Sequence, residues 1–442
     1  MTERLVVIGG DAGGMAAASG VRRARPDLEI VVLEKGVRTS YAACGIPYHV
    51  SGEVDDVESL VARAPEVFRA KQDIDVRLRH EAMAIDLGAR TVEARDLEGG
   101  ETVTLGFDQL MIGTGARPIA PPWSGIGQPG VHLVHTLADA SAIAALATDV
   151  EGRRVAVVGG GYIGVEMAEA FVQRGARVTV YDMAPQLLRN LDPDMAALVG
   201  DAAEGHGIEL RLGQPVVDVE PGRVIGQQDS HEADLIVLGL GVTPNGELAG
   251  AAGLTTGVRG AISVDDHQRT SAEGVYAAGD CCESHHRVTG QPTWIALGTV
   301  ANKAARVAGI NLGGGDARFP GVLGTAITRL FDTEIARTGL TEVEALAAGF
   351  DPVATTVRAS TRAHYFPGNG PVHVKLVHDR GDRRLLGGQI VGAPGAGKRI
   401  DTIATALWAE MSVDDLVYLD LAYAPPFSPV WDPVNTAARQ AE

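Results

Sequence analysis

The stretch that decides the fold is Arg154-Val155-Ala156-Val157-Val158-Gly159-Gly160-Gly161-Tyr162-Ile163-Gly164. An apolar run typical of a buried strand leads into three glycines, and a helical pattern continues to Arg174. Strand, glycine turn and helix in this order form the fingerprint of a dinucleotide-binding βαβ unit. The next expected strand, 177–181, ends at Asp182, whose carboxylate can accept from a free ribose 2′-hydroxyl and would repel a 2′-phosphate. The pattern favours NADH and leaves NADPH possible.

The same order of elements occurs nearer the N-terminus. A strand over 4–8 precedes Gly9-Gly10-Asp11-Ala12-Gly13-Gly14, and a helix is expected over 15–24. Asp11 stands where the second glycine of the fingerprint belongs, and the next strand, 29–33, leads into Glu34. One such fingerprint is weak evidence, because glycine turns also serve packing alone. Two units with different glycine patterns predict two different dinucleotides.

The second unit is expected to interrupt the first. Residues 108–118 and 234–245 resemble each other, since each is an apolar strand that runs into glycines and then proline, as two hinges would. From about residue 319 the pattern changes to alternating strands, among them 372–377 and 385–391, and to a helix over 398–411. The predicted fold is α/β, with two Rossmann-like units and a C-terminal α+β domain. The predicted boundaries are 1–115 with 241–319 for the first unit, 116–240 for the second and 320–442 for the third.

Size and charge limit the partners. A chain of 442 residues has room for about three domains. Its 56 acidic and 38 basic residues give a net charge of −18, which disfavours binding to nucleic acid and to anionic lipid. No apolar run is long enough to span a bilayer. Three cysteines are too few for a disulfide framework and no signal-peptide pattern is present, so we expect a cytoplasmic protein with neither nucleic-acid nor membrane partners.

Cys44 is the candidate reactive residue. It lies in Ser40-Tyr41-Ala42-Ala43-Cys44-Gly45-Ile46-Pro47-Tyr48, just downstream of the first nucleotide-binding unit. Pro47 suits the first turn of a helix, and the unpaired N–H groups at a helix start favour a thiolate. The sequence therefore predicts a redox-active thiol. The alternative is a small buried hydrophobic residue, which is a common environment of free cysteine.

Other motifs invite functional interpretations that we set aside. Cys281 and Cys282 are adjacent and are taken as packed thiols, because a disulfide between neighbours is strained. The spacing of the histidines provides no third metal ligand, so no metal is predicted. Residues 392–399 resemble a phosphate loop, but Arg399 stands where a Ser or Thr would hold magnesium, so the start of a helix is favoured. The proline-rich segment 423–433 is too apolar for a free tail and must dock on something.

Taken together, these motifs resemble the pyridine nucleotide-disulfide oxidoreductases over essentially the whole chain. The further stretches that carry the resemblance are 114–118 (Thr-Gly-Ala-Arg-Pro), 276–280, 324–327 and 423–428. The likeness is to the single-cysteine branch, which includes coenzyme A-disulfide reductases, NADH oxidases and persulfide reductases. It implies FAD on the first unit and NAD(P)H on the second. It also implies a homodimer built by the C-terminal domain, whose 423–433 segment reaches the partner subunit's active site.

The resemblance assigns roles to individual residues. Glu34 would bind the adenosine ribose, Asp280 would bind the ribityl chain, and Tyr162 would cover the flavin until nicotinamide displaces it. The cofactor-binding residues expected from the family are Gly9, Asp11, Ala12, Gly14, Glu34, Lys35, Thr114, Gly115, Arg117, Gly159, Gly161, Tyr162, Ile163, Gly164, Asp182, Gly241 and Asp280.

The implied chemistry passes a hydride from nicotinamide to flavin N5 and then electrons to Cys44, held as a mixed disulfide from which a small thiol leaves. Cys44, Tyr365 and Tyr423 are the expected catalytic residues, with the tyrosines bonding or protonating the departing sulfur. Arg23, Ser40, Lys71 and Asn302 are the expected substrate-binding residues. Arg23 and Lys71 could meet the phosphates of coenzyme A, or they are ordinary solvated charges.

The chain departs from the coenzyme A pattern at several places. Ala43 replaces an asparagine, Ala16 and Gly20 replace polar residues on the first helix, and Trp431 replaces a lysine. One alternative is an NADH oxidase acting on oxygen or peroxide, although relatives with that chemistry carry a histidine where this chain has Ala12. Another is a redox-inactive dinucleotide-binding sensor with an inert thiol. The first alternative predicts turnover with oxygen, and the second predicts no bleaching of the flavin by NADH.

Overall fold

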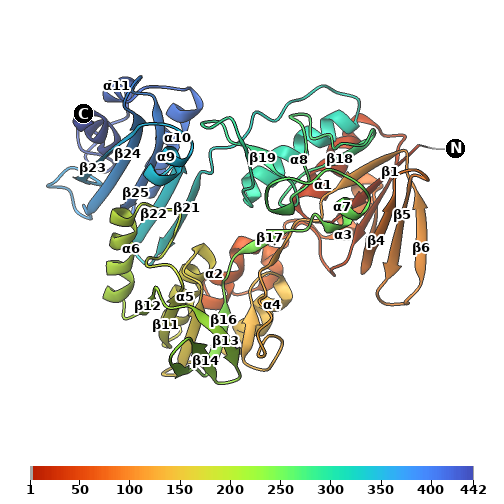
Figure 1. Ribbon diagram of the computed structural model, residues 1–442, viewed down its shortest axis with the longest axis horizontal. Coiled ribbons are helices and arrows are strands. Elements are labelled where there is room, and N and C mark those ends of the chain that lie inside the picture. Colours follow the sequence, from red (N-terminus) through yellow and green to blue (C-terminus); the bar gives the residue numbers. More distant parts are fainter. Residues whose placement is uncertain (1–2, 442) are drawn as a thin grey trace.

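The structure, a computed structural model, describes residues 3–441 and has three lobes (Figure 1). The N-terminal lobe lies at the right of Figure 1, the central part of the chain forms the lower lobe, and the C-terminal lobe lies at the upper left. Each lobe is built on its own five-stranded sheet. Among the described residues, no helix combines the length and the apolar character that crossing a membrane requires.

The first sheet is parallel and has the strand order β18-β7-β1-β2-β3. Its strands are β1 (Arg4–Ile8), β2 (Glu29–Glu34), β3 (Asp75–Leu78), β7 (Gln109–Ile112) and β18 (Val275–Ala277). Helices α1 (Ala12–Ala24) and α8 (Gly298–Leu312) pack closely against each other. A smaller antiparallel sheet consists of β4 (His80–Asp86), β5 (Thr91–Asp96) and β6 (Thr102–Gly106). Because β18 and α8 follow the whole second unit in sequence, this lobe is assembled from two separate parts of the chain.

The second sheet repeats the parallel design in the order β12-β11-β10-β16-β9. Its strands are β9 (Val131–Leu133), β10 (Arg154–Val158), β11 (Arg177–Asp182), β12 (Glu209–Leu212) and β16 (Leu235–Leu238). The helices of this lobe are α4 (Leu137–Ala147), α5 (Tyr162–Gln173) and α6 (Pro193–Gly205), and β13 (Val216–Glu220), β14 (Arg223–Gly226) and β15 (Ser230–Glu232) form a small sheet. The first two fingerprint strands keep the same relation in both units: Ile8 lies opposite Leu33 in one, and Val158 lies opposite Tyr181 in the other.

Two short strands join the lobes. β8 (Ala116–Pro118) and β17 (Val242–Pro244) pair antiparallel, with Arg117 opposite Thr243. The two segments interpreted as hinges therefore lie side by side. The residue boundaries proposed for the three domains stay a prediction.

The third sheet is antiparallel, in the order β21-β22-β25-β24-β23. Its strands are β21 (Ala326–Leu330), β22 (Thr333–Gly339), β23 (Pro352–Ser360), β24 (Pro371–Asp379) and β25 (Leu385–Gly392). The helices of this lobe are α9 (Glu342–Ala347), α10 (Ile400–Trp408), α11 (Val413–Val417) and α12 (Pro433–Gln440). The helix expected over 398–411 is shorter than predicted, because a 3₁₀ turn over 397–399 precedes it and the chain leaves the helix after Trp408.

Helix α2 (Ile46–Ser51) connects the lobes, although in sequence it lies between β2 and β3 of the first unit. It packs on α4 and α5 of the second unit, and Ile46 and Val50 belong to that unit's core. Leu330 and Ile335 of the C-terminal sheet close the same core. The remaining elements are α3 (Pro65–Gln72), α7 (Glu247–Ala251), β19 (Ser284–His285) and β20 (Pro292–Thr293). The segment that carries Cys44 is thus held at the junction of all three lobes.

Candidate functional site

The two glycine turns have nearly the same backbone. Gly9 and Gly159 have φ values of +105° and +110°, which only glycine adopts without strain. A Cβ on Gly14 would lie 1.8 Å from the carbonyl oxygen of Gly9, and one on Gly164 would lie 1.7 Å from that of Gly159. The first glycine of each fingerprint is therefore required by its positive φ, and the last by close packing of the turn against its own helix.

The acid that follows each second strand is tied to its glycine turn. Glu34 Oε2 accepts a hydrogen bond from the N–H of Gly10 at 2.6 Å, and Asp182 Oδ2 accepts one from that of Gly160 at 2.6 Å. The second oxygen of each carboxylate accepts from another backbone N–H, that of Gly36 at 2.6 Å or Ala184 at 2.7 Å. Each oxygen keeps a lone pair, so both carboxylates are fixed in position and can still accept from ribose hydroxyls.

Asp11 occupies the place of a fingerprint glycine for a local reason. Its Oδ1 accepts a hydrogen bond from the N–H of Tyr41 at 3.1 Å, and the N–H of Ser40 donates to the carbonyl of Gly10 at 3.1 Å. The first glycine turn is thereby joined to the segment that carries Cys44. Burial, reinforced by Glu34 and Asp280, raises the pKa of Asp11 to about 6.

Asp280 provides a test of whether the first unit fits a flavin nucleotide. Its Oδ1 is buried and has no hydrogen-bond partner among the described residues, and burial raises its pKa to about 6. A buried carboxylate oxygen without a partner is costly. A hydroxyl of a ribityl chain would satisfy this oxygen, so the donor set fits FAD at this sheet edge.

The other expected cofactor residues surround the hinge and the second turn. Thr114 donates from its hydroxyl to the Asn245 carbonyl at 2.7 Å, and Arg117 donates to Asn245 Oδ1 at 2.8 Å and pairs with Glu247. Gly115 and Gly241 have φ values of +66° and +90°. Lys35 and Gly161 are exposed, Ala12 begins α1, and Tyr162 and Ile163 begin α5.

Cys44 lies in a 3₁₀ turn over 43–45 that leads into α2, and it is exposed and free. Pro47 is in the first turn of α2, as expected. The surrounding protein nevertheless raises the pKa of the thiol, mainly by partial burial and also through the charges of Glu166 and Asp280. This direction is opposite to the expectation that the helix start favours the thiolate, because partial burial and then the charges of Glu166 and Asp280 disfavour the charged form.

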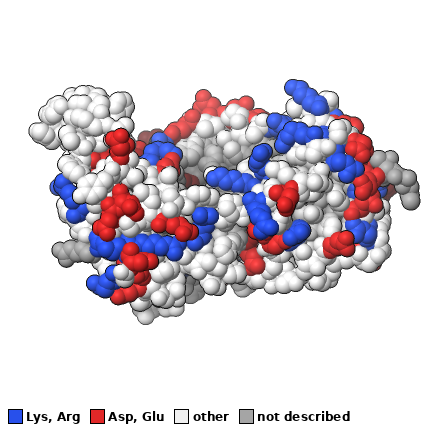
Figure 2. Space-filling model, turned by 90° about the horizontal axis from the view of Figure 1, so that it is seen from above, with Lys and Arg blue, Asp and Glu red and all other residues white. Residues whose placement is uncertain are grey.

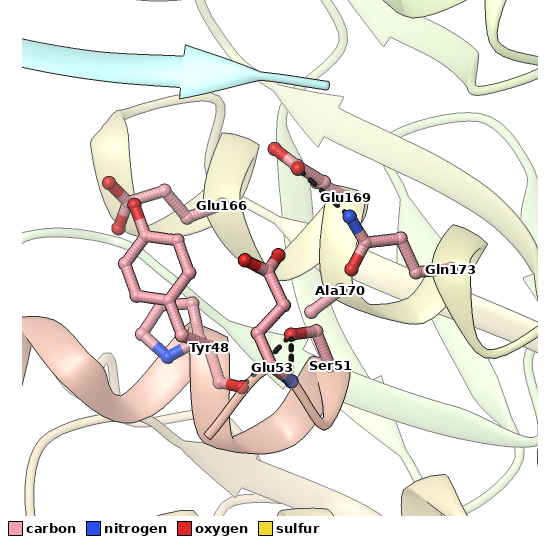
Figure 3. A pocket seen from close by; sticks show the side chains of 8 residues that line it. Tyr48, Ser51, Glu53, Glu166, Glu169, Ala170 and Gln173 are labelled. Carbon is pink, nitrogen blue, oxygen red and sulfur yellow. Dashed lines mark hydrogen bonds between the residues drawn. The ribbon is translucent and has the colours of Figure 1, made fainter. Parts of the chain in front are cut away.

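A small acidic pocket lies where α2, the helix that follows Cys44 in sequence, meets α5 (Figure 3). Its volume is about 10 Å³, roughly that needed for one water, so no substrate fits inside it. Figure 3 shows Glu166 beside the Tyr48 ring, with Glu53 below and Glu169 paired with Gln173. Burial raises the pKa of Glu166 and of Glu169. Of these carboxylates, Glu166 is also among the groups that raise the pKa of Cys44.

Residues of β21, in the C-terminal lobe, contact the acidic side chains of this pocket. The Thr328 hydroxyl donates to Glu166 Oε1 at 2.6 Å. Arg329 pairs with Glu53, lies 3.6 Å from Glu169 Oε1, and sits 5.4 Å from the centre of the Tyr48 ring. Sequence reasoning missed Glu166. Its spacing of four residues from Tyr162, on one face of α5, was the available signal.

The two expected catalytic tyrosines lie together. Tyr423 is hydrogen-bonded to Tyr365, and partial burial followed by this neighbour raises the pKa of Tyr423. The two loops are joined by a hydrogen bond from the N–H of Ala363 to the carbonyl of Pro425 at 3.2 Å. Neither tyrosine is among the groups that influence Cys44 within the described part of the chain. The single chain therefore pairs the tyrosines with each other and leaves them apart from the thiol.

Segment 423–433 docks on its own chain only in part: Ser428 is buried and Arg399 donates to the Phe427 carbonyl at 2.7 Å, but the large apolar side chains are exposed. Tyr423, Phe427, Val430 and Trp431 are 48%, 74%, 72% and 42% exposed, and Tyr365 nearby is 64% exposed. We call these five residues the C-terminal apolar patch. An exposed apolar patch of this kind is typical of a protein interface.

The expected substrate-binding residues come from neighbouring elements of the first lobe. Arg23 is exposed on α1, Lys71 on α3 and Asn302 on α8, and Ser40 has a φ of +48°. α1 packs against α8, and Arg22 donates to the Asp73 carbonyl at 2.8 Å, which ties the end of α1 to that of α3. In Figure 2, Lys and Arg side chains lie in both halves of the view and are mixed with acidic side chains. No direct contact among these four residues is recorded within 3–441.

The motifs set aside from the sequence have structural explanations. Cys281 and Cys282 are buried and free, with their Sγ atoms 3.6 Å apart. Glu334 accepts from the N–H groups of Gly395 at 3.0 Å and Gly397 at 2.6 Å, so the phosphate-loop-like turn is already occupied.

One group of described residues, Asp265, Asp266 and His267, has ligand atoms close enough to suit a metal. Arg269 and Arg318 already pair with its two carboxylates. The expectation of no metal stays a prediction.

Comparison with known proteins identifies the family. The family model described as pyridine nucleotide-disulphide oxidoreductase matches residues 3–305, and the model of its dimerisation domain matches residues 325–433. The chain belongs to the pyridine nucleotide-disulphide oxidoreductase family. It is an α/β oxidoreductase with a C-terminal dimerisation domain, as the resemblance in its sequence indicated.

Curated relatives cover nearly the whole chain. The NAD(P)H coenzyme A polysulfide/persulfide reductase of Pyrococcus horikoshii is 40% identical, over 99% of this chain and 98% of its own length. The NADH oxidase of Methanocaldococcus jannaschii is 36% identical, with the same two coverages. The coenzyme A disulfide reductase of Staphylococcus haemolyticus is 31% identical, over 99% of both chains.

Solved structures agree with these relatives. Reduced CoADR-RHD of Bacillus anthracis superposes with a TM-score of 0.96 at 34% identity, covering 99% of this chain and 80% of the other. The NAD-dependent persulfide reductase of A. fulgidus gives a TM-score of 0.94 at 38% identity, covering 99% of this chain and 82% of the other. The oxidoreductase family thus shares this three-lobed arrangement.

Proposed function

We propose that this chain is an FAD-dependent NAD(P)H oxidoreductase that reduces a low-molecular-weight disulfide or persulfide through Cys44. The observation that carries the proposal is the position of the thiol. Cys44 is exposed, its segment is hydrogen-bonded to the first glycine turn through Asp11, and α2 behind it packs on the second unit. This position supports a role for Cys44 as the reactive sulfur between the two dinucleotide-binding units.

The residues of each unit support the binding of FAD by the first unit and of NAD(P)H by the second. Asp280, with its unsatisfied buried oxygen, and Glu34 would hold FAD on the first unit. Asp182 would hold the ribose of NADH, and its carboxylate disfavours the 2′-phosphate of NADPH. When bound, FAD accepts a hydride from the reduced nicotinamide and delivers two electrons to a disulfide. The protein's part is to orient the cofactors and exclude water between them.

The thiol chemistry balances in two steps. The Cys44 thiolate attacks a disulfide RSSR, so that a Cys44–S–S–R bond forms, the original S–S bond breaks and RS⁻ leaves to take up a proton. Two electrons from NAD(P)H then cleave Cys44–S–S–R to the Cys44 thiolate and a second RS⁻, which is protonated. The sum is RSSR + NAD(P)H + H⁺ → 2 RSH + NAD(P)⁺. Because the pKa of Cys44 is raised in the bare chain, the thiolate needs stabilisation from the bound cofactor or from a proton acceptor.

A homodimer would complete this site. The C-terminal apolar patch is exposed on the single chain, and it lies in the domain matched by the family's dimerisation model. We propose that the patch binds a second copy of the chain and carries Tyr423 and Tyr365 to the partner's Cys44. There a phenol could donate its proton to the departing sulfur.

The substrate class follows from the exposed cations. Arg23 on α1 and Lys71 on α3 could bind the phosphates of a coenzyme A-type thiol. Because the protein as a whole is acidic, it needs a local basic surface to bind such an anionic substrate. The relatives named for coenzyme A support this reading. The replacement of family positions by Ala16, Gly20 and Ala43 leaves other small disulfides and polysulfide open. The cytoplasmic location expected from cysteine usage stays a prediction.

The test compares the wild-type protein with Cys44→Ser. Anaerobic titration with NADH should bleach the flavin of both proteins, because hydride transfer to the flavin does not need the sulfur. Turnover with coenzyme A disulfide, other small disulfides and polysulfide should be lost in Cys44→Ser. Retained disulfide turnover would end the proposed mechanism.

The same experiment tests the two alternatives. An NADH oxidase, favoured by the relative of that name, would consume oxygen faster than any disulfide. Ala12 stands where such relatives carry a histidine, and this difference argues against the oxidase alternative. A sensor with an inert thiol would fail to bleach its flavin with a stoichiometric amount of NADH.

A further inference from the structure

Tyr162 is held by a hydrogen bond from outside its helix. It is the first residue of α5, directly after Gly159–Gly161, and its side chain is partly buried. The side-chain amide of Asn190 donates to the Tyr162 hydroxyl, with 2.9 Å between Nδ2 and the phenol oxygen. Asn190 lies in the loop 183–192, which follows Asp182 and leads into α6. The phenol at the start of α5 therefore has a fixed position set by a residue far from it in sequence.

Asn190 cannot easily follow Tyr162 if the ring moves, because its own backbone is anchored. Arg337 of β22 donates from Nη1 to the Asn190 carbonyl at 2.7 Å. The Arg337 side chain is only 10% exposed, and its Nη2 pairs with Glu344 at 2.9 Å. Arg337 is thus fixed within the C-terminal lobe and holds the loop from that side.

Further contacts anchor the loop on both sides of Asn190. Toward the glycine turn, the N–H of Leu188 donates to the Gly160 carbonyl at 2.8 Å. Toward α6, the N–H of Asp192 donates to Gln389 Oε1 at 2.8 Å. Inside the loop, Gln186 Nε2 donates to the Leu191 carbonyl at 2.9 Å. Because Asn190 is anchored, the hydrogen bond to Tyr162 must break when the Tyr162 ring moves, so this bond resists the movement of the ring.

We infer that Asn190 is a positioning residue that latches Tyr162 over the start of α5 and thereby weakens the binding of the nicotinamide dinucleotide. This inference rests on the proposed function. A dinucleotide whose pyrophosphate lies at the start of α5 reaches the first unit by passing Tyr162. The ring must turn aside, and the anchored Asn190 amide then loses its acceptor. The C-terminal lobe thus sets the resistance to nicotinamide entry through Arg337 and Asn190.

The test measures NAD⁺ binding by the oxidised, FAD-loaded protein, which does not turn NAD⁺ over. Asn190→Ala removes the donor, and Tyr162→Phe removes the acceptor but keeps the ring. Because a neutral hydrogen bond contributes modestly, each variant should lower the Kd for NAD⁺ by about fivefold. For Asn190→Ala, the KM for NADH should fall by a similar factor, whereas kcat should stay within about twofold. Gln228→Ala, an exposed amide in the same lobe, is the matched control and should leave Kd unchanged.

The double variant Asn190→Ala/Tyr162→Phe makes the test specific. If both residues act through one bond, the double variant should bind NAD⁺ as each single variant does. An unchanged or raised Kd in the single variants, or additive effects in the double variant, would overturn the latch. If Asn190→Ala fails to fold, Tyr162→Phe alone still tests the latch, because the inference requires this variant to lower the Kd for NAD⁺. If the wild type reduces its flavin with NADH and the variants bind unchanged, only the latch fails. A wild type that binds no NAD⁺ overturns the proposed function as well.

Discussion

Asp192 and Gln389 exchange two hydrogen bonds between the second and third lobes. The N–H of Asp192 donates to Gln389 Oε1 at 2.8 Å, and Gln389 Nε2 donates to Asp192 Oδ2 at 2.6 Å. Lys375 lies beside them, with Nζ 3.4 Å from Asp192 Oδ2 and 2.8 Å from Asp194 Oδ1. The side chains of Asp192 and Lys375 are 2% and 5% exposed. This buried polar group joins α6 to the C-terminal sheet and so fixes the loop that carries Asn190.

Removing the cation from this group should destabilise the protein. Lys375→Met leaves Asp192 as a buried carboxylate without its counter-charge, a change that typically costs about 3–5 kcal/mol. We expect the first thermal transition to fall by several degrees in differential scanning calorimetry. Lys398→Met is the matched control, since Lys398 is exposed and pairs only with Asp401 at the surface. That change should cost less than about 1 kcal/mol, and equal effects of the two substitutions would contradict the argument.

The reactivity of Cys44 should depend on Glu166. The pKa of the thiol is raised first by partial burial and then by the charges of Glu166 and Asp280. Glu166→Gln removes one of these charges, so the thiolate fraction at pH 8 should rise. Alkylation of the flavin-free protein by iodoacetamide should become roughly two- to threefold faster.

Glu169→Gln provides the control for this measurement. Glu169 lines the same pocket but is not among the groups that raise the pKa of Cys44 in the described chain. Its alkylation rate should match that of the wild type. A slower rate in Glu166→Gln would mean that this carboxylate assists the thiolate and does not oppose it.

Asp280 should make the flavin-free protein less stable as the pH rises. Its pKa is about 6 in the folded chain and 3.8 in the ordinary reference state, so the folded form binds the proton more tightly. Stability from this group is full below about pH 4, declines as the pH rises toward 6 and is constant above. The difference amounts to at most roughly 3 kcal/mol.

Asp280→Asn removes this dependence. Urea unfolding of the flavin-free proteins should show the variant more stable than the wild type at pH 7, with the gap closing near pH 4. FAD affinity should fall in the same variant, because an uncharged amide replaces the carboxylate at the expected ribityl site. A gap that widens at low pH would show that the sign of this argument is wrong.

The C-terminal apolar patch should determine the oligomeric state. Phe427 is 74% exposed on the single chain, and Phe427→Asp places a charge where we propose that a second copy binds. We expect light scattering to report a monomer in which NADH still reduces the flavin. Disulfide turnover should fall by at least about tenfold, since a tyrosine from the partner would no longer reach Cys44. Met83→Asp, at a 50%-exposed residue of β4, should remain a dimer.

Local patterns predicted the framework of this fold well. The strands 4–8 and 154–158 have the expected bounds, since each is an apolar run ended by a glycine whose positive φ the turn requires. The site itself depended on contacts between distant segments. The partner of Asp11 is the backbone of Tyr41. The pKa of Cys44 is raised first by burial and then by two carboxylates, Glu166 on α5 and Asp280 after β18. Spacing along α5 puts Glu166 on the same face as Tyr162, but it does not indicate a contact with Cys44. The bond between Asn190 and Tyr162 likewise joins segments far apart in sequence.

Substitution by alanine should have different effects on the folding of the protein at Gly164 and at Gly161 of the second fingerprint. A Cβ on Gly164 would lie 1.7 Å from the Gly159 carbonyl oxygen, whereas a Cβ on Gly161 would meet nothing within 4 Å. Gly164→Ala must therefore push α5 away from the turn and should give little folded protein. Gly161→Ala should fold with a circular dichroism spectrum and a melting temperature like those of the wild type.

Gly161→Ala should nevertheless weaken binding of NAD⁺. The open space in front of Gly161 lies at the start of α5, where backbone N–H groups would approach the pyrophosphate and an added methyl would hold it off. We expect the Kd for NAD⁺, measured by calorimetric titration, to rise by at least about tenfold, equivalent to roughly 1.4 kcal/mol. FAD content should not change, because Gly161 belongs to the second unit. In the first unit, which we expect to bind FAD, the matching position is Asp11. Unchanged NAD⁺ binding by a folded Gly161→Ala protein would place the dinucleotide elsewhere than the start of α5.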